Sequence, residues 1–443
     1  MKARTFPGGI HPPENKYLTE KKPIERAAAP ELVVIPLSQH IGAPCKPIVK
    51  VGDEVKMGQK IGEAQGFVSV PIHSSVSGKV KTIGPFQHPL GNVQPAITIE
   101  NDGKDDAVDP LEPLDDIRDV EPKKLIDRIR ELGLVGMGGA TFPTHVKLSP
   151  PKEKPIDTAI LNGTECEPYL TADHRLMLEQ PTRIINGFKV VIRVLNANRA
   201  IIGIEANKPD AIEVMRQSLN GSGNIEVFKL LVKYPQGGEK QLIKSLLDRE
   251  VPPPPGLPMD VGVVVQNVGT AAAIADAVFE GRPLIERVTT VTGSGVKEPK
   301  NLLVRVGTLA SHLIEQCGGY NGKIGKIIFG GPMMGIAQST DQVPAIKGTS
   351  GVLVLIKDDT TIREPEPCIR CGRCVEACPI HLRPYLLGSL IEKDRLRDAE
   401  AESVLDCIEC GSCAFVCPAS RWLVHLFKSA KAQIMAKKRT SKK

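Results

Sequence analysis

Two copies of one cysteine pattern near the C-terminal end constrain this chain more than any other feature of its sequence. Eight of the 11 cysteines fall between residues 368 and 417, and each group of four follows the spacing Cys-x2-Cys-x2-Cys-x3-Cys-Pro. Disulfide frameworks usually distribute cysteines over the fold that they join, so a repeated and clustered pattern indicates ligation instead. The other three, Cys45, Cys166 and Cys317, lie far apart and are expected to pack as small apolar side chains.

The spacing is typical of proteins that hold two [4Fe–4S] clusters. Three closely spaced thiolates surround three corners of a cubane, and the fourth cysteine of each run ligates the other cluster. The predicted ligands are Cys368, Cys371, Cys374 and Cys417 for cluster 1, and Cys407, Cys410, Cys413 and Cys378 for cluster 2. Structural zinc is the alternative, but four thiolates suffice for one tetrahedral ion, so zinc would not explain eight cysteines and two trailing Cys-Pro pairs. The helical pattern between the two runs favours an α-helical ferredoxin type.

The rest of the composition describes a globular protein of several domains. The chain has 443 residues, of which 41% are hydrophobic and 24% charged, and about three domains are expected at this length. Aromatic residues make up only 4%, which argues against a protein that stacks many nucleic-acid bases. No apolar run reaches the roughly 18 residues of a membrane span, and the start of the chain lacks the apolar core of a secretory signal. We therefore expect a cytoplasmic protein that binds no nucleic acid.

Short β-like runs separated by Gly, Pro and Asp occupy residues 31–100. Within them, Val51–Val55 and Ser77–Val80 resemble the two halves of a biotinyl/lipoyl-type barrel-sandwich domain. Carrier domains of that type present a modifiable lysine at the tip of a hairpin, whereas the tip here, Glu63–Val68, has none. Residues 1–100 are therefore assigned to an N-terminal segment and a barrel-sandwich domain without a carrier role, and an acidic linker follows over 101–122.

Helix-like and strand-like segments alternate from residue 123 to 286, which indicates a parallel sheet with crossover helices. Residues 287–356 have the pattern of a small β-grasp unit, and the cysteine domain covers 364–422. The predicted fold class is therefore multidomain α/β.

The last segment, 423–443, is predicted to be a basic helix and tail. Four residues recur on it at helical spacing, namely Leu423, Phe427, Ala430 and Ile434. A helix of this kind either docks on a partner or on anionic lipid, or packs on the cysteine domain. The sequence leaves these alternatives open.

Three Gly-rich or polar stretches of the α/β region lie where a nucleotide site could form. They cover 133–147, 162–168 and 234–240, and a further polar segment follows at 266–270. The second comes directly after a strand-like run, and parallel sheets bind ligands beyond the carboxyl ends of their strands. A purely structural explanation stays open, in which the glycines form a tight turn, Glu165 faces a helix N-terminus and Lys147 is a solvated surface group.

These motifs, in this order, resemble the NADH-oxidising, FMN-binding subunit of respiratory complex I. They are Gly-x-Gly-Gly-Ala-x-Phe-Pro-Thr-x-x-Lys, Asn-x-x-Glu-x-Glu-Pro, Tyr-x-x-Gly-x-Glu and Asn-Val-x-Thr. Together with the segment Phe6–Pro13, the barrel-like domain and the cysteine runs, they make the whole chain similar to the C subunit of the Rnf (Rsx) electron-transport complexes. The resemblance implies a Rossmann-like FMN/NAD domain over 123–286 and an SLBB-type β-grasp domain over 287–356.

The resemblance also assigns roles to single residues. It implies that Gly136, Gly138 and Gly139 let the backbone approach the flavin and its phosphate, and that Lys147 meets this phosphate. It places Asn162 and Glu165 at the isoalloxazine ring or ribityl chain, Asn267 and Thr270 at the FMN tail, and Glu167 at the nicotinamide nucleotide. The residues expected between flavin and nicotinamide are Tyr234, Gly237 and Glu239.

The chain departs from the complex I pattern at three positions. Thr164 stands where Asp is usual, Gly238 where the first of two Glu is usual, and Gly269 where Glu is usual. These departures are expected to change the detailed contacts with the nucleotide more than the binding of the flavin.

The function implied by the resemblance is that of a peripheral subunit at the cytoplasmic face of the inner membrane, in an ion-translocating NAD:ferredoxin oxidoreductase complex. Hydride would be exchanged between NAD(H) and non-covalent FMN, so that no catalytic side chain is expected. Single electrons would pass through the two [4Fe–4S] clusters to other subunits, including a ferredoxin-like iron–sulfur subunit. The alternatives are a soluble flavin/iron–sulfur reductase of a corrinoid-type acceptor, and a non-catalytic electron-wiring subunit.

Overall fold

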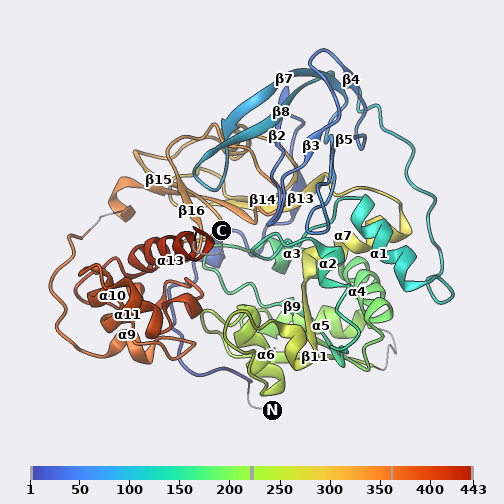
Figure 1. Ribbon diagram of the computed structural model, residues 1–443. Coiled ribbons are helices and arrows are strands. Elements are labelled where there is room, and N and C mark those ends of the chain that lie inside the picture. The colour runs from blue at the N-terminus through green and yellow to red at the C-terminus, as the bar shows by residue number, and fades with distance from the viewer. Residues whose placement is uncertain (1–2, 220–223, 361–362, 441–443) are drawn as a thin grey trace.

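The computed structural model describes residues 3–219, 224–360 and 363–440. Figure 1 shows an N-terminal β domain on one side, an α/β body below it, and a C-terminal helical unit beside both. Short 3₁₀ helices connect some elements, at Lys16–Leu18, Pro258–Val261, Lys357–Thr360 and Val404–Asp406. Across the described ranges, no helix combines the length and the apolar character needed to cross a membrane.

Two small antiparallel sheets enclose the core of the N-terminal β domain. The strands of the first are β2 (Leu32–Pro36), β8 (Val93–Asn101), β7 (Gly78–Gln87) and β4 (Glu54–Val55), in this spatial order. The strands of the second are β3 (Lys46–Pro47), β5 (Lys60–Glu63) and β6 (Ile72–His73). Val33 and Ile97 from the first sheet pack with Ile61 and Ile72 from the second, because alternate residues of each strand face inward. The two sheets thus form the expected sandwich.

A parallel four-stranded sheet forms the middle of the α/β body. Its strands, in spatial order, are β11 (Ile225–Leu230), β10 (Arg199–Glu205), β9 (Thr158–Gly163) and β12 (Val263–Asn267). The helices of this region are α1 (Pro122–Glu131), α2 (Thr144–Lys147), α3 (Ala172–Glu179), α4 (Pro181–Leu195), α5 (Pro209–Ser218), α6 (Glu239–Leu247) and α7 (Val268–Phe279). Leu161 of β9 packs into a core with α4 and α7, whereas the adjacent Ile160 packs against Leu242 of α6. Helices therefore cover both faces, as apolar strands of this kind require.

A six-stranded mixed sheet completes the body. Its strands, in spatial order, are β1 (Ile24–Arg26), β14 (Lys300–Arg305), β13 (Glu286–Thr292), β17 (Gly351–Ile356), β15 (Ile324–Phe329) and β16 (Ile336–Gln338), and α8 (Ala310–Gln316) packs on it. The edge strand β1 comes from the N-terminal segment and pairs in parallel with β14. No sequence pattern predicts this pairing, which carries part of the 1–100 segment away from the barrel-sandwich.

The two cysteine runs give the C-terminal unit an internal repeat. Its helices are α9 (Arg373–Glu376), α10 (Pro384–Ile391), α11 (Leu396–Ala401), α12 (Ser412–Phe415) and α13 (Leu423–Thr440). In each run, the second residue after the first cysteine is left-handed, with φ of 54° at Arg370 and 59° at Glu409. The glycine after the second cysteine is left-handed too, with φ of 80° at Gly372 and 83° at Gly411, a conformation that glycine adopts without strain.

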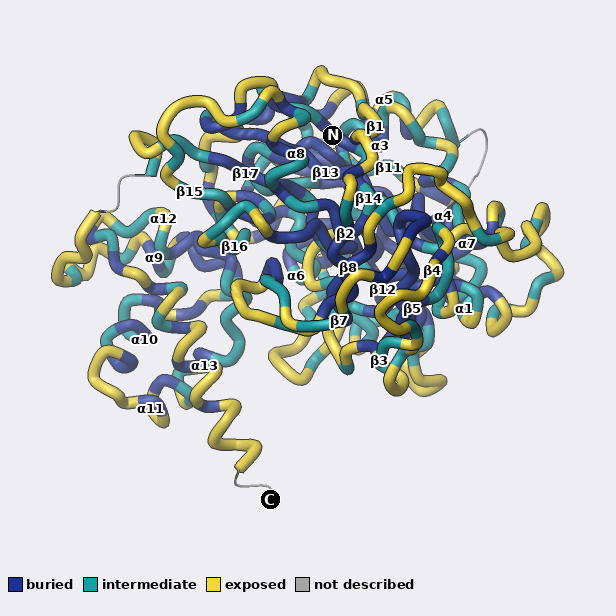
Figure 2. Tube along the Cα trace, turned by 90° about the horizontal axis from the view of Figure 1, so that it is seen from above, coloured by how far each residue is buried: buried dark blue, intermediate teal, exposed yellow. Residues whose placement is uncertain are grey.

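The apolar stripe of the C-terminal helix is buried in the same unit. Leu423, Phe427, Ala430 and Ile434 of α13 are all at most 3% exposed and pack with α10 and α11. Of the alternatives left open by the sequence, the structure therefore shows packing on the cysteine domain. Figure 2 shows the end of α13 projecting from the body as an exposed segment. Residues 441–443 of the predicted basic tail lie outside the described residues.

Candidate functional site

Two asparagines meet at the carboxyl edge of the parallel sheet. Asn162 near the end of β9 and Asn267 at the end of β12 are register partners on neighbouring strands. Asn267 is also the N-cap of α7, and its Oδ1 accepts hydrogen bonds from the N–H groups of Gly269 (2.8 Å) and Thr270 (3.2 Å). This edge is the usual ligand-binding side of a parallel sheet, and the start of α7 adds the positive end of a helix dipole.

The Gly-rich loop between α1 and α2 passes directly over Asn267. The Met137 N–H donates to Thr270 Oγ1 at 2.9 Å, which ties the loop to α7. A Cβ at Gly138 would lie 2.8 Å from Asn267 Cβ, whereas a Cβ at Gly139 would have no atom within 4 Å. The first glycine is therefore required by close packing, and the second borders open space. Gly136 closes the loop through the hydrogen bond from its N–H to the Phe142 carbonyl, at 2.9 Å.

The motifs at 162–168 and 234–240 are joined by direct hydrogen bonds. Asn162 Nδ2 donates to the Gly237 carbonyl at 2.9 Å, and the Gly237 N–H donates to Cys166 Sγ at 3.2 Å. A side chain at Gly237 would collide with Thr164, since a Cβ there would lie 2.4 Å from Thr164 Oγ1. Together with the Gly-rich loop and the segment at 266–270, four predicted motifs thus meet at one edge of the sheet, although 75 residues separate Asn162 from Gly237.

Lys147 and Glu239 form an ion pair at the rim of this site. Lys147 Nζ lies 2.6 Å from Glu239 Oε1, with side chains 29% and 38% exposed. Lys147 ends α2 and Glu239 begins α6, so the pair connects the Gly-rich loop to the Gly237 turn. A phosphate that reached Lys147 would compete with Glu239 for its ammonium group.

Glu165 lies at the N-terminus of α3. Its carboxylate accepts the N–H groups of Asp173 (2.7 Å) and His174 (3.1 Å). This is the structural role that the sequence analysis kept open, and the predicted contact of Glu165 with the flavin stays a prediction. Lys16, which is buried, donates from Nζ to the Glu165 carbonyl at 2.8 Å, and burial, followed by the charge of Lys208, lowers its pKa.

Asp173 is a residue of this site that the sequence analysis missed. Its Oδ2 accepts Asn267 Nδ2 at 2.6 Å, and burial, followed by the charge of Glu165, raises its pKa to about 7. Arg287, which is buried nearby and donates to the Met137 carbonyl, opposes this shift. The local sequence signal for Asp173 was its position as an acidic residue in the first turn of the helix that follows the Asn162 turn. Many surface helices have an acidic residue at this position.

Glu167 joins the flavin motif to the β-grasp unit. Both of its carboxylate oxygens accept backbone N–H groups of the turn between β15 and β16, from Met333 at 3.2 Å and Met334 at 2.8 Å. Burial raises the pKa of Glu167 to about 7. Its predicted contact with the nicotinamide nucleotide stays a prediction.

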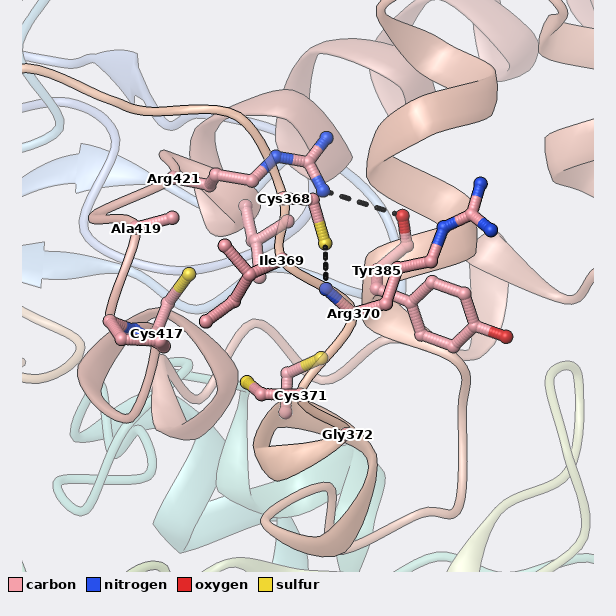
Figure 3. A pocket seen from close by; sticks show the side chains of 12 residues that line it. Cys368, Ile369, Arg370, Cys371, Gly372, Tyr385, Cys417, Ala419 and Arg421 are labelled. Atoms are coloured by element: carbon pink, nitrogen blue, oxygen red, sulfur yellow. Dashed lines mark hydrogen bonds between the residues drawn. The ribbon is translucent and has the colours of Figure 1, made fainter.

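The predicted cluster 1 ligands line one cavity. Cys368, Cys371, Cys374 and Cys417 all border it, and Figure 3 shows three of them around the cavity together with Arg421. The Arg370 N–H points at Cys368 Sγ from 3.4 Å, as peptide groups around a cubane do. The residues present therefore suit a [4Fe–4S] cluster, with the fourth ligand supplied by the second cysteine run.

The predicted cluster 2 ligands also come together. Burial is the largest cause of the raised pKa of the Cys413 thiol. The next causes are the electrostatic effects of the nearby thiols of Cys407, Cys410 and Cys378, followed by that of Cys374. N–H groups point at two of these sulfurs, from Leu382 to Cys378 at 3.3 Å and from Glu409 to Cys407 at 3.4 Å.

The two halves of the site touch at Tyr234. Its hydroxyl donates to the carbonyl of Cys410 at 2.8 Å, and the residue is only 2% exposed. The side chain packs with Ile10, Ala377 and Cys410 in a small apolar core. Tyr234 therefore belongs both to the predicted flavin motif and to the surroundings of a predicted cluster ligand.

Comparison with known proteins identifies each of these regions. Family models match for the RnfC barrel sandwich hybrid domain (residues 4–104), the Nuo51 FMN-binding domain (129–276), the SLBB domain (288–337) and a 4Fe–4S dicluster domain (360–418). These matches confirm the predicted fold class. The chain therefore has an FMN-binding domain and a dicluster domain, which confirms the predicted cofactors.

Relatives match over nearly the whole length. The C subunit of the proton-translocating ferredoxin:NAD(+) oxidoreductase complex of Clostridium ljungdahlii is 52% identical over 97% of this chain and 94% of its own. The C subunit of the Na(+)-translocating complex of Acetobacterium woodii is 47% identical over 99% of both chains. The C subunit of the ion-translocating oxidoreductase complex of Rhodobacter capsulatus is 43% identical over 96% of this chain and 82% of its own.

A solved structure supports the fold independently. An NAD+-reducing [NiFe]-hydrogenase in the H2-reduced state aligns with a TM-score of 0.52 and 18% identity, over 73% of this chain and 67% of that chain. At this identity the likeness concerns the fold alone. On the full-length sequence matches, the chain belongs to the RnfC family, the C subunits of ion-translocating ferredoxin:NAD+ oxidoreductase complexes.

Proposed function

We propose that this chain is the peripheral subunit that exchanges electrons with NAD(H) in a membrane-bound ferredoxin:NAD oxidoreductase complex. Electrons pass between NAD(H) and FMN as a pair and through the two [4Fe–4S] clusters singly, to or from other subunits that include an iron–sulfur protein. The subunit sits at the cytoplasmic face of the cell membrane. The relatives named as subunits of such complexes, together with the FMN and dicluster domains, support this function.

One observation carries the proposal. The motif that gathers at the carboxyl edge of the parallel sheet is in direct contact with the cysteine unit, through the hydrogen bond between Tyr234 and Cys410. A pair-accepting site and a one-electron relay are therefore packed together within one chain. An isolated dicluster carrier or an isolated flavin domain would not need this contact.

The residues of the sheet edge have distinct parts in holding FMN. The backbone at Gly139 borders open space that suits the approach of a flat ring, and the start of α7 at Asn267 offers N–H groups and a positive dipole. Lys147 supplies the positive charge for the phosphate. FMN itself supplies the exchange between electron pairs and single electrons.

An anaerobic NADH titration tests this function. The full-length protein is purified without oxygen, its iron and FMN are quantified, and NADH is added while visible and EPR spectra are recorded. We expect the flavin absorbance to bleach and signals of reduced clusters to appear. Protein that holds clusters and FMN, yet in which NADH bleaches neither, would contradict the proposal.

A matched pair of cysteine variants provides the control. Cys371→Ser removes a predicted cluster ligand, whereas Cys317→Ala changes a buried cysteine that lies outside both cysteine runs. The first is expected to lower the iron content and the second to leave it unchanged.

A further inference from the structure

Two buried lysines hold the loop that follows β9 and carries the motif at 162–168. Lys16 comes from the N-terminal segment and is 5% exposed, and Lys208 comes from the turn between β10 and α5 and is 1% exposed. A lysine is almost never buried to this degree unless its charge has partners. Both lysines lie outside the four sequence motifs of the site. Their role at this loop rests on the proposed function, in which the loop contacts FMN.

Lys16 holds three carbonyl groups of the loop. Its Nζ donates to the carbonyl oxygens of Glu165 at 2.8 Å, Glu167 at 3.0 Å and Leu170 at 2.5 Å. A lysine has three donors only as an ammonium group. These three partners therefore keep the proton on Lys16, although burial, followed by the charge of Lys208, lowers its pKa.

Lys208 holds the carbonyl group at the start of the loop. Its Nζ donates to the Thr164 carbonyl at 2.7 Å and to Asn207 Oδ1 at 2.9 Å, and it lies 3.4 Å from Glu205 Oε2. Burial raises the pKa of Glu205, and the charges of Lys208 and Lys16 oppose this shift. Two ammonium groups thus accompany one carboxyl group, so an excess of positive charge remains whether or not Glu205 is ionised.

The backbone of the loop has a conformation that needs such support. Glu165 and Tyr169 are left-handed, with φ of 46° and 69°, which residues other than glycine adopt only at a cost. Strained residues of this kind persist where the surrounding contacts fix them. The Tyr169 N–H donates to the Glu14 carbonyl at 2.7 Å, so Glu14 and Lys16 both hold the loop from the N-terminal segment. This segment is therefore part of the site, although it precedes the Rossmann-like module in sequence.

The direction of the peptide groups in the loop follows from these contacts. The C=O and N–H groups of a trans peptide point in opposite directions. Because the carbonyls of Thr164 and Glu165 point at the lysines, the N–H groups of Glu165 and Cys166 point away from them. The peptide dipoles and the ammonium charges therefore act in the same sense and favour negative charge on the side of the loop opposite the lysines.

We propose that Lys16 and Lys208 are positioning residues of the flavin site, which fix the 164–170 loop and make the site favour reduced over oxidised flavin. A hydride from NADH brings two electrons and one proton, so that the flavin gains one negative charge and NAD+ is released. Fixed positive charge and oriented N–H groups in a buried site stabilise such a charge. The two lysines act through the backbone of the loop and not as catalytic groups.

Reductive titration of the flavin with dithionite and redox dyes tests this proposal without NADH. Full-length protein with clusters and FMN is titrated anaerobically, and the flavin absorbance is followed after subtraction of FMN-free protein treated in the same way. We expect Lys16→Met to weaken the binding of reduced FMN about tenfold more than that of oxidised FMN, because one buried charge is lost. For a two-electron couple, this ratio makes the midpoint potential of the flavin about 30 mV more negative. An unchanged or more positive potential would overturn the proposal.

Two further variants separate the charge from other effects of the substitution. Lys300→Met removes a lysine charge from the six-stranded sheet, where Glu25 is its partner at 2.9 Å, and we expect an unchanged flavin potential. Lys16→Gln keeps hydrogen-bond donors but no charge, and we expect the same negative shift as in Lys16→Met. A wild-type potential in Lys16→Gln would show that the charge is not needed and would overturn the proposal.

Lys208→Met tests the second lysine and serves if the Lys16 variants do not fold, which their iron content and unfolding midpoints reveal. We expect a negative shift that is smaller than in Lys16→Met, because Glu205 partly compensates the charge of Lys208. An unchanged potential in folded Lys208→Met would contradict the role of Lys208.

These measurements distinguish the role of the lysines from the proposed function. If NADH reduces the flavin of Lys16→Met and its potential is that of the wild type, the function stands and the role of the lysines is overturned. If the potential shifts as expected but NADH reduces neither wild type nor variant, the NADH reaction is contradicted and the role of the lysines stands.

Discussion

At the scale of single residues, side-chain amides and one lysine organise the sheet edge. Asn267 accepts two N–H groups of α7 and donates to Asp173, so it fixes the helix start and a buried carboxyl together. Lys147 is the cation that the sequence motif assigned to the flavin phosphate, and both Lys147 and its partner Glu239 are partly exposed. The lysine can therefore exchange a carboxylate for a phosphate without leaving a buried charge unpaired.

Replacing Lys147 tests this role. We expect Lys147→Ala to weaken FMN binding about tenfold, or about 1.4 kcal/mol, because a charge-assisted contact to the phosphate is lost. Fluorescence titration of the flavin-free protein with FMN measures the change. Lys154→Ala, which removes an ion pair with Asp260 elsewhere in the same domain, is expected to leave FMN affinity unchanged. Equal affinities for Lys147→Ala and wild type would remove Lys147 from the site.

The buried carboxyl of Glu167 gives the protein a pH-dependent stability. Its folded-state pKa, about 7, lies above the ordinary value of 4.5, so the folded protein binds more protons than the unfolded chain between these values. The contribution of this group is largest below about pH 4.5 and is lost as the pH rises through 7. We expect the stability of the wild type relative to Glu167→Gln to fall by at most about 1.4 kcal/mol per pH unit in this window.

Denaturation midpoints of the two proteins, measured from pH 5 to 8, check this expectation. Glu213→Gln, a change on an exposed helix position, controls for the loss of a charge. A difference between wild type and Glu167→Gln that does not change with pH would show that Glu167 titrates normally.

The sequence identified those site residues that belong to a short motif or to a family pattern. Asn162, Asn267 and Gly237 do come together, because strand ends and the turns after them share one edge of a parallel sheet. Asp173 was missed because its importance depends on Asn267, 94 residues away. The hydrogen bonds from the β15–β16 turn to Glu167 could not be predicted for the same reason, because Met333 and Met334 lie far from Glu167 in the sequence.

At the scale of elements, local sequence patterns predicted those strands and helices that have a clear apolar pattern. The strand at 158–163 and the helix at 181–195 follow directly from a short continuous apolar run and from a helical apolar pattern. The pairing of β1 with β14 has no such signal, because a three-residue strand carries little pattern and its partner lies more than 270 residues later. The stripe on α13 was recognised, but only the structure shows what covers it.

Truncation of one stripe residue tests the packing of α13. Phe427 is 1% exposed in the core of the cysteine unit. We expect Phe427→Ala to destabilise that unit by about 3 to 5 kcal/mol, through lost burial and the cavity that remains. Met435→Ala, at a position that is 45% exposed on the same helix, is expected to change stability by less than about 0.5 kcal/mol.

The midpoint of cluster bleaching in an anaerobic denaturant series measures both variants. Similar midpoints for Phe427→Ala and Met435→Ala would show that the stripe does not support the cysteine unit.

At the scale of the whole molecule, the N-terminal segment joins three parts that are distant in sequence. Arg4 bridges to Leu230 of β11, Gly9 bonds Ala377 of the cysteine unit, and β1 extends the six-stranded sheet. Figure 1 shows the same arrangement, with the cysteine unit beside the α/β body and not at the end of a free tether. The spacing between flavin module and cluster 2 is therefore set by packing, which suits a fixed electron path.

Flavin bleaching and cluster reduction after mixing with NADH test this account most directly. Full-length protein with and without bound FMN is mixed anaerobically with NADH, frozen at successive times and examined by EPR, and the flavin absorbance is recorded in parallel. The account predicts that signals of reduced clusters appear in the FMN-loaded protein together with bleaching of the flavin, and that they do not appear in the FMN-free protein. Reduction of the clusters by NADH in FMN-free protein would contradict the account.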